Sequence, residues 1–260
     1  QRLGKCKVKP LLAVGGCMVG RYGAEELAAE LPEVDLWLPT AEMPRWPAMV
    51  AAALALPEPP ARIVGGGRLL STGPSYAWLK VGEGCRHKCA FCTIPSIRGG
   101  LKSLTAEHIV DEARALLGQG VRELALVAQD LTAWGRDLDA PGGLRVLLDG
   151  LLPLAGLERL RLMYLYPTGL TEELLDYLRA AGDPFVPYFD IPLQHAATPV
   201  LKAMKRPASS ENNLERIKAW RAICPDITIR STFIAGFPGE TEAEFEELLQ
   251  FLETARLDRV

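Results

Sequence analysis

Short apolar runs alternate along most of the chain with longer segments whose apolar residues recur every three or four positions. The runs at 76–81, 124–127, 160–165, 186–191 and 227–235 predict strands, and 258–260 is predicted to begin another. The amphipathic segments predict helices at 105–117, 144–152, 171–181 and 198–223 (broken near Pro207), and a last helix that begins with a capping box at Thr241 and Glu244. Repeated strand–helix units predict an α/β fold with a parallel sheet, either an open doubly wound sheet or a barrel.

The first 75 residues follow a different pattern. The apolar run 8–16 ends in Gly15-Gly16-Cys17 and predicts a buried strand that leads into a tight turn, with a helix over 21–31. Residues 41–75 are rich in Pro, Ala and Gly, with a short strand expected near 68–70. We therefore predict a fragment of a smaller α/β domain at 1–56, a linker at 57–75 and the main domain at 76–260.

Composition narrows the class of protein. A chain of 260 residues with 48% hydrophobic residues can bury a sizeable core. A formal charge of −3 predicts no direct nucleic-acid binding, and no apolar stretch approaches the roughly 20 residues that span a membrane. Six cysteines, three of them close together, indicate a reducing cytoplasm, and Cys6 and Cys224 are interpreted as ordinary free cysteines. Both ends of the chain fall within predicted elements, so we expect a piece of a longer protein.

The strongest chemical signal is a loop with three closely spaced cysteines, Cys85, Cys89 and Cys92. Thiolates are soft ligands that select zinc, copper(I) or iron–sulfur clusters. A structural zinc site needs four ligands, and only His87 lies near enough in the sequence to be the fourth. Three cysteines on a 4Fe–4S cluster would instead leave one iron open to a small molecule. Three free thiols are the remaining alternative.

The other unusual polar residues follow the predicted strands. They are Gln129-Asp130, Tyr166, Gln194-His195 and the loop 236–240. Because the carboxyl ends of parallel strands meet at one edge of a sheet or barrel, we expect these residues to share a site with the cysteines.

Several stretches resemble one family, the radical S-adenosylmethionine (SAM) methylthiotransferases that modify a ribosomal protein. The cysteine spacing itself resembles the signature of the whole radical SAM superfamily. The family motifs are Val81-Gly82-Glu83-Gly84-Cys85, Ile94-Pro95-Ser96-Ile97-Arg98-Gly99, Leu126-Val127-Ala128-Gln129-Asp130, Tyr164-Leu165-Tyr166-Pro167, Asp190-Ile191-Pro192-Leu193-Gln194-His195-Ala196 and the loop 232–240. The resemblance covers residues 5–260 almost continuously.

The resemblance implies a partial radical SAM (βα)6 TIM-like barrel that follows part of a smaller α/β domain. It implies a methylthiotransferase that adds a methylthio group to the β-carbon of an aspartate in a loop of a small-subunit ribosomal protein. The implied cofactors are SAM and a 4Fe–4S cluster on Cys85, Cys89 and Cys92. A second cluster would use Cys17 and two cysteines upstream of Gln1. The other implied partners are an electron donor and a sulfur donor, and no membrane.

The resemblance also suggests cofactor-binding residues, and each has a simpler alternative. Gln129 and Asp130 match the strand end at which the superfamily contacts the methionine amino group, although they could be a strand cap. Arg230 could pair with a carboxylate of SAM or of the substrate, or form a structural ion pair. Gly236 and Phe237 could contact adenine, or form an ordinary turn. Phe91 is expected to pack over the cluster or adenine, Gln194 is assigned by motif alone, and His195 could equally be a core histidine.

Two other functions are weighed against this one. A tRNA methylthiotransferase is similar at the cysteine loop, but that family carries Gln-Asn where this chain has Gln129-Asp130, and Gln-Ser-Gly where it has Gln194-His195-Ala196. A non-catalytic zinc-binding module would show neither brown colour nor SAM cleavage.

Overall fold

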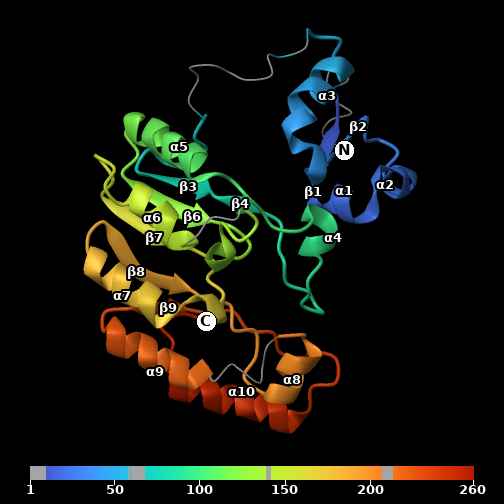
Figure 1. The fold of residues 1–260 in the computed structure, drawn as a ribbon. Helices are drawn as coiled ribbons and strands as arrows, with labels where there is room; N and C mark the ends of the chain where they lie inside the picture. Colours follow the sequence, from blue (N-terminus) through green and yellow to red (C-terminus); the bar gives the residue numbers. More distant parts are fainter. Residues whose placement is uncertain (1–9, 58, 60–67, 139–141, 207–212) are drawn as a thin grey trace. The chain divides into compact units, whose positions relative to one another are not determined.

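The chain folds into two compact units, drawn as a ribbon in Figure 1. The computed structural model describes residues 10–57, 59, 68–138, 142–206 and 213–260. Unit 1 contains residues 1–66 together with 93–100, and unit 2 contains residues 67–92 and 101–260. The division falls inside the predicted linker. The segment 93–100, which was assigned to the barrel from the sequence, groups with unit 1.

Unit 1 is a small α/β arrangement with two parallel strands. β1 (Ala13–Gly16) pairs with β2 (Leu36–Pro39), and α1 (Cys17–Tyr22) and α2 (Ala24–Glu30) lie between them in the chain. A 3-10 helix η2 (Thr40–Arg45) and α3 (Trp46–Ala53) follow, and α4 (Ile94–Arg98) packs on α1. Gly20 permits this packing, because a Cβ added there would lie 3.0 Å from Ile97 Cγ2.

The expectations for unit 1 are partly corrected. The predicted helix 21–31 begins earlier, at Cys17, and is interrupted at Gly23, whose φ of 82° suits glycine. β2, α3 and α4 were not predicted. The predicted strand near 68–70 is wrong. Arg68 instead anchors this segment through its side chain, which pairs with Glu112 at 2.9 Å and donates to the Trp78 carbonyl at 2.6 Å.

Unit 2 is built on one parallel sheet. Its strands are β3 (Tyr76–Lys80), β6 (Glu123–Val127), β7 (Arg159–Leu162), β8 (Phe185–Asp190) and β9 (Thr228–Arg230), and they lie side by side in that order. All five fall on predicted apolar runs, and apolar side chains on every strand are buried without measurable exposure. The run 227–235 forms a shorter strand than expected, followed by a single bridge between Gln194 and Phe233.

The strand order decides between the two predicted topologies. Within this sheet, each strand pairs with the sheet strand that precedes it in the chain, and the order does not reverse among the described strands. A doubly wound sheet has such a reversal, whereas a barrel continues in one direction. Arg259 continues the series with a parallel bridge to Arg230. The partial TIM-like barrel is thus confirmed.

The sheet is covered by helices that alternate with its strands. They are α5 (Ala106–Gly118), α6 (Leu144–Leu151), α7 (Glu172–Ala181), α9 (Asn213–Ile223) and α10 (Glu242–Ala255), and Figure 1 shows them following one another along the sheet. The predicted capping box is present, because Thr241 and Glu244 exchange hydrogen bonds at the start of α10. The segment 198–223, predicted as one or two helices broken near Pro207, contains α8 (Thr198–Ala203) and α9, and Pro207 itself lies outside the described residues.

A small antiparallel ribbon precedes and follows the cysteine loop. β4 (Gly82–Glu83) ends directly before Gly84 and Cys85, and β5 (Lys102–Ser103) pairs with it where the chain returns to unit 2. The ribbon therefore fixes both sides of the loop next to the sheet. Within the described ranges, no helix is both long and apolar enough to cross a membrane.

Candidate active site

The three cysteines of the loop are all half-buried free thiols. Burial raises the pKa of the Cys85 thiol, and the charges of Asp130, Cys89 and Cys92 act in the same direction, while a backbone hydrogen bond at His87 opposes them. Metal binding requires the thiolate form, so loading this loop would release protons. The part of the chain that the structure describes holds no group of three or more His, Cys, Asp or Glu arranged around a single metal ion. The roles of Cys85, Cys89 and Cys92 as cluster ligands therefore stay a prediction.

His87 fixes the first half of the loop to the ends of two strands. Its Nε2 lies 2.7 Å from Oδ2 of Asp130, which is nearly buried at the end of β6. Its ring stacks on Tyr166 with 3.9 Å between centroids, and the buried Arg206 guanidinium lies over the same tyrosine at 4.2 Å. Since Nε2 is directed at Asp130, only Nδ1 of His87 could serve as a metal ligand.

The second half of the loop is held by α8. The Ala90 amide donates to the Met204 carbonyl at 2.9 Å. The Phe91 side chain packs with Phe237 and Ile234 against a small apolar cluster formed by Ala197, Val200 and Met204. Phe91 and Phe237, both predicted to contact the cofactor, are thereby brought into one cluster.

Gln129 presents an acceptor whose partner is missing. Its Nε2 donates to Oε1 of Glu83 at 3.2 Å, which fixes the orientation of the amide. Its Oε1 is buried and has no hydrogen-bond partner among the described residues. A buried acceptor without a partner is unfavourable, so it points to a donor that binds there. The amino group of a bound methionine moiety would be such a donor.

Arg230 is engaged by a residue that the sequence did not single out. Its Nη1 lies 2.6 Å from Oδ2 of Asp190, whose side chain is 2% exposed at the end of β8. Burial raises the pKa of Asp190, and the guanidinium opposes this shift. The structural ion pair, one of the two predicted roles, is therefore present, while 39% of the Arg230 side chain remains accessible.

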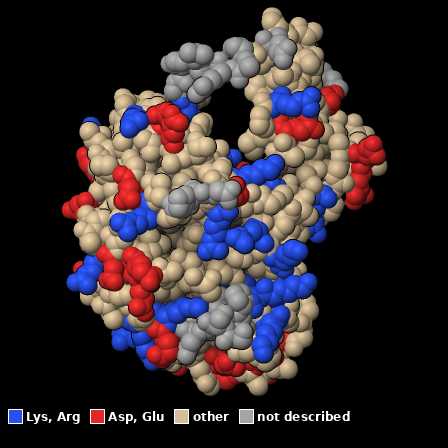
Figure 2. Space-filling model, in the orientation of Figure 1, with Lys and Arg blue, Asp and Glu red and all other residues tan. Residues whose placement is uncertain are grey.

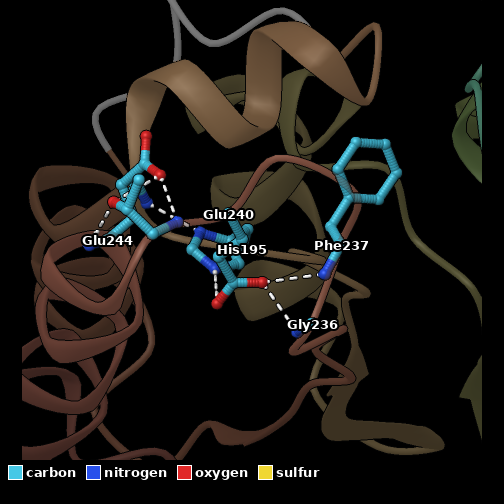
Figure 3. Close-up of polar contacts among 7 residues, drawn as sticks. His195, Gly236, Phe237, Glu240 and Glu244 are labelled. Carbon is cyan, nitrogen blue, oxygen red and sulfur yellow. Dashed lines mark hydrogen bonds and ion pairs between the residues drawn. The ribbon is translucent and has the colours of Figure 1, made fainter.

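The turn after β9 is organised by a carboxylate. Oε2 of Glu240 accepts the backbone N–H groups of Gly236 at 2.7 Å and Phe237 at 2.9 Å, and Figure 3 shows both bonds converging on it. These two N–H groups are therefore used within the turn and not offered to a ligand. Gln194 has a φ of 75°, and its backbone N–H and C=O bond to Thr232 and Ile234. The role of the Gln194 side chain stays a prediction.

Cys17, the predicted ligand of a second cluster, lies in unit 1. It begins α1, is half-buried, and accepts a hydrogen bond from Nη2 of Arg98 at 3.3 Å. In the sequence, Arg98 stands out only as a member of a family motif. No local pattern could have revealed the contact, because the two residues are 81 positions apart. Of the two cysteines interpreted as ordinary, Cys224 is buried in the main core, and Cys6 lies outside the described residues.

The surface around the cysteine loop of unit 2 is basic, although the chain is acidic overall. Arg86 and Lys88 of the loop, and Lys202 and Lys205 of α8 and the turn after it, are exposed and form no ion pair with described residues. Figure 2 shows Lys and Arg side chains gathered over α8 and the neighbouring loop. This local charge favours anionic groups near the site.

Comparisons with known proteins agree with the architecture. The Radical SAM superfamily profile matches residues 79–252. The chain is 58% identical over 250 residues to the ribosomal protein uS12 methylthiotransferase RimO of Nitratidesulfovibrio vulgaris strain DP4, covering 95% of this chain and 56% of that protein. It is 57% identical to the protein of the same name from Oleidesulfovibrio alaskensis, with the same coverage. The chain thus spans about half the length of the curated relatives it matches, and the resemblance seen in its motifs is confirmed.

Solved structures support the fold alone. The cobalamin-dependent SAM radical enzyme OxsB, with aqua-cobalamin and SAM bound, aligns with a TM-score of 0.63 at 14% identity, covering 94% of this chain and 39% of that one. The radical SAM methyltransferase TsrM from Kitasatospora setae, with cobalamin and a [4Fe-4S] cluster bound, aligns with a TM-score of 0.57 at 20% identity, covering 70% and 35%.

Proposed function

The chain belongs to the radical SAM superfamily, and we propose that it is the catalytic part of a methylthiotransferase that modifies an aspartate of ribosomal protein uS12. One observation carries the proposal: 58% identity over 250 residues to a protein named for this activity. The aligned region spans 95% of this chain. The substrate is proposed from this similarity, and the local structure supports the chemistry.

We expect residues of unit 2 to bind the two cofactors of this superfamily. Cys85, Cys89 and Cys92 would hold three irons of a 4Fe–4S cluster and leave the fourth for SAM. When bound, cluster and SAM would supply the one-electron reductive cleavage of SAM that starts the reaction. The unsatisfied Oε1 of Gln129 would accept a hydrogen bond from the SAM amino group. Phe91, on the apolar cluster next to the loop, would exclude water from the cofactor.

The remaining parts of the reaction need other components. Cys17 would contribute to a second cluster, whose other ligands would have to come from outside residues 1–260. An electron donor must reduce the first cluster, and a sulfur donor must supply the thio group, which SAM would methylate. The reducing cytoplasm suits all of these components. The exposed cations around the cysteine loop would attract the carboxylate of the acceptor aspartate.

Mass spectrometry of the acceptor tests this function. The full-length, cluster-loaded enzyme is incubated with reductant, sulfide, SAM and either uS12 or unmodified tRNA. We expect a methylthio group on the β-carbon of one uS12 aspartate and no change in the tRNA. A Cys89→Ala enzyme serves as the control and should leave uS12 unmodified. A methylthio group on an adenosine would assign the tRNA function, and absence of SAM cleavage by the wild type would favour the zinc-binding module.

A further inference from the structure

His195 and Glu240 form a buried pair beneath the turn that carries Phe237. The side chain of His195 has no exposed surface and that of Glu240 is 4% exposed. Nε2 of the histidine lies 3.3 Å from Oε1 of the glutamate, and Oε2 of the same carboxylate holds the amides of Gly236 and Phe237 (Figure 3). One carboxylate thus connects the histidine after β8 to the turn after β9.

The hydrogen bonds fix which atom of His195 carries the proton. The Ala197 amide donates to Nδ1 at 3.0 Å, so Nδ1 is an acceptor and Nε2 carries the hydrogen that points to Glu240. The Ala197 amide thus donates to His195, and His195 in turn donates to Glu240. Burial acts to raise the pKa of Glu240, but the donors at Phe237, His195 and Gly236 outweigh it and hold that pKa below its usual value. Glu240 is therefore an anion that accepts three hydrogen bonds, from His195, Gly236 and Phe237.

This pair helps to hold a turn that contains two exposed glycines. Gly236 and Gly239 have φ angles of 77° and 90°, and both are exposed. The backbone of the turn makes one further bond, from the Glu240 amide to the Phe237 carbonyl at 2.8 Å. Because glycine has many conformations available, losing the carboxylate would leave the turn with more freedom to move. Phe237 and Phe91 of the cysteine loop each pack against the same apolar cluster, which includes Ala197. The turn and the cysteine loop are thus aligned through residues that His195 and Glu240 anchor.

We propose that His195 is a positioning residue, which acts through Glu240 to hold the Gly236–Phe237 turn in the shape that binds the adenosyl half of SAM. The proposal rests on the proposed function, which supplies the ligand, and on the adenine contact that the family resemblance suggests for Gly236 and Phe237. It assigns His195 no contact with SAM. It distinguishes His195 from a histidine that only stabilises the core, because the turn it controls lies at the strand ends, beside the cysteine loop.

The test compares the affinities for the two halves of SAM. L-methionine and 5′-deoxyadenosine are titrated separately into the full-length, cluster-loaded protein by anaerobic equilibrium dialysis. The variants are His195→Ala and Glu240→Gln. Glu240→Gln replaces one of the two carboxylate oxygens by an NH2 group. That NH2 group would lie either against the N–H groups of Gly236 and Phe237 or against His195 Nε2, so one set of hydrogen bonds is lost. Glu244→Gln is the matched control, since Glu244 caps α10 four residues later and contacts neither Gly236 nor Phe237 (Figure 3).

We expect both variants to bind 5′-deoxyadenosine on the order of tenfold more weakly, the effect of losing one hydrogen bond to a charged group. Their affinity for methionine should match the wild type, and Glu244→Gln should match it for both compounds. Hydrogen–deuterium exchange of the 236 and 237 amides, measured without ligand, should be faster in both variants only. If His195→Ala fails to fold, Glu240→Gln carries the same comparison.

The possible results distinguish a failure of the His195 inference from a failure of the proposed function. If the wild type binds both compounds and the variants lose neither, or lose both equally, His195 has only a structural role and the inference is wrong. The proposed function would survive that result. If the cluster-loaded wild type binds neither compound, the proposed function fails and takes this inference with it.

Discussion

Replacing Arg230 by leucine should destabilise unit 2 strongly, because it would leave the Asp190 carboxylate buried without its partner. The carboxylate is 2% exposed and lies 2.6 Å from the guanidinium, at the end of a strand inside the sheet. Breaking a buried ion pair on one side costs about 3–5 kcal/mol. For a unit of this size, that corresponds to a fall of roughly 6–20 °C in melting temperature.

The pH dependence of Arg230→Leu identifies the cause. Burial already raises the pKa of Asp190, and removing the guanidinium, which opposes that shift, should raise it further. A carboxyl group whose pKa is higher in the folded than in the unfolded state favours folding when protonated, and this contribution is lost as pH rises through the folded-state pKa. The melting temperature of the variant should therefore be closest to that of the wild type in mild acid, and the difference should grow towards neutral pH.

Thermal melts of the metal-free protein, followed by circular dichroism at several pH values, measure both effects. Arg159→Leu is the control, because Arg159 is 68% exposed and its nitrogen lies 3.9 Å from Glu123. Such a surface pair should cost less than about 1 kcal/mol. Adding Asp190→Asn to Arg230→Leu should recover much of the loss. An equal loss at all pH values, with no recovery in the double variant, would refute the buried-charge argument.

Three further perturbations test separate parts of the site and the fold. His87→Phe keeps an aromatic ring on Tyr166 but removes the hydrogen bond to Asp130, so the free energy of unfolding should fall by about 1–3 kcal/mol. The iron content of the reconstituted protein should stay unchanged, and a loss of iron would instead make His87 a metal ligand. Glu240→Gln should have a lower melting temperature than the wild type at about pH 6, and this difference should shrink as pH falls through the lowered pKa of Glu240. A difference in melting temperature that does not change with pH would contradict this prediction. Gly169→Ala places a methyl group against the Thr132 side chain and should lower the free energy of unfolding by about 1–3 kcal/mol, measured by denaturant melts. A variant as stable as the wild type would contradict the close contact between residues 169 and 132.

The repeating part of the fold could be predicted because its apolar pattern is local. Each strand of the sheet from β3 to β9 overlaps a predicted run rich in apolar residues, although β7 and β9 also contain arginines, and α5 and α10 have recognisable threonine caps. β2 has only four residues, and α3 lies in a segment whose Pro and Ala content resembles a linker. α4 has five residues directly after the cysteines, too few to show a helical period.

The sequence could predict where the site lies, but not which of its side chains pair with each other. Side chains at strand ends could be recognised because parallel strands end at one edge. Their partners could not, because His87–Asp130, Arg230–Asp190 and His195–Glu240 are pairs 43, 40 and 45 residues apart. Sequence spacing carries no signal at such separations. The structure therefore adds the partners of Asp190 and Glu240, which the sequence showed only as members of motifs, and the stacking of His87 and Arg206 on Tyr166.

Reductive cleavage of SAM is the most direct test of the central claim, that Cys85, Cys89 and Cys92 hold a cluster with one iron open to SAM. The full-length protein is reconstituted anaerobically with iron and sulfide, reduced with dithionite and supplied with SAM, and 5′-deoxyadenosine is quantified by chromatography. We expect turnover by the wild type and none by Cys89→Ala. Unchanged turnover in Cys89→Ala, or none in an iron-loaded wild type, would contradict the claim.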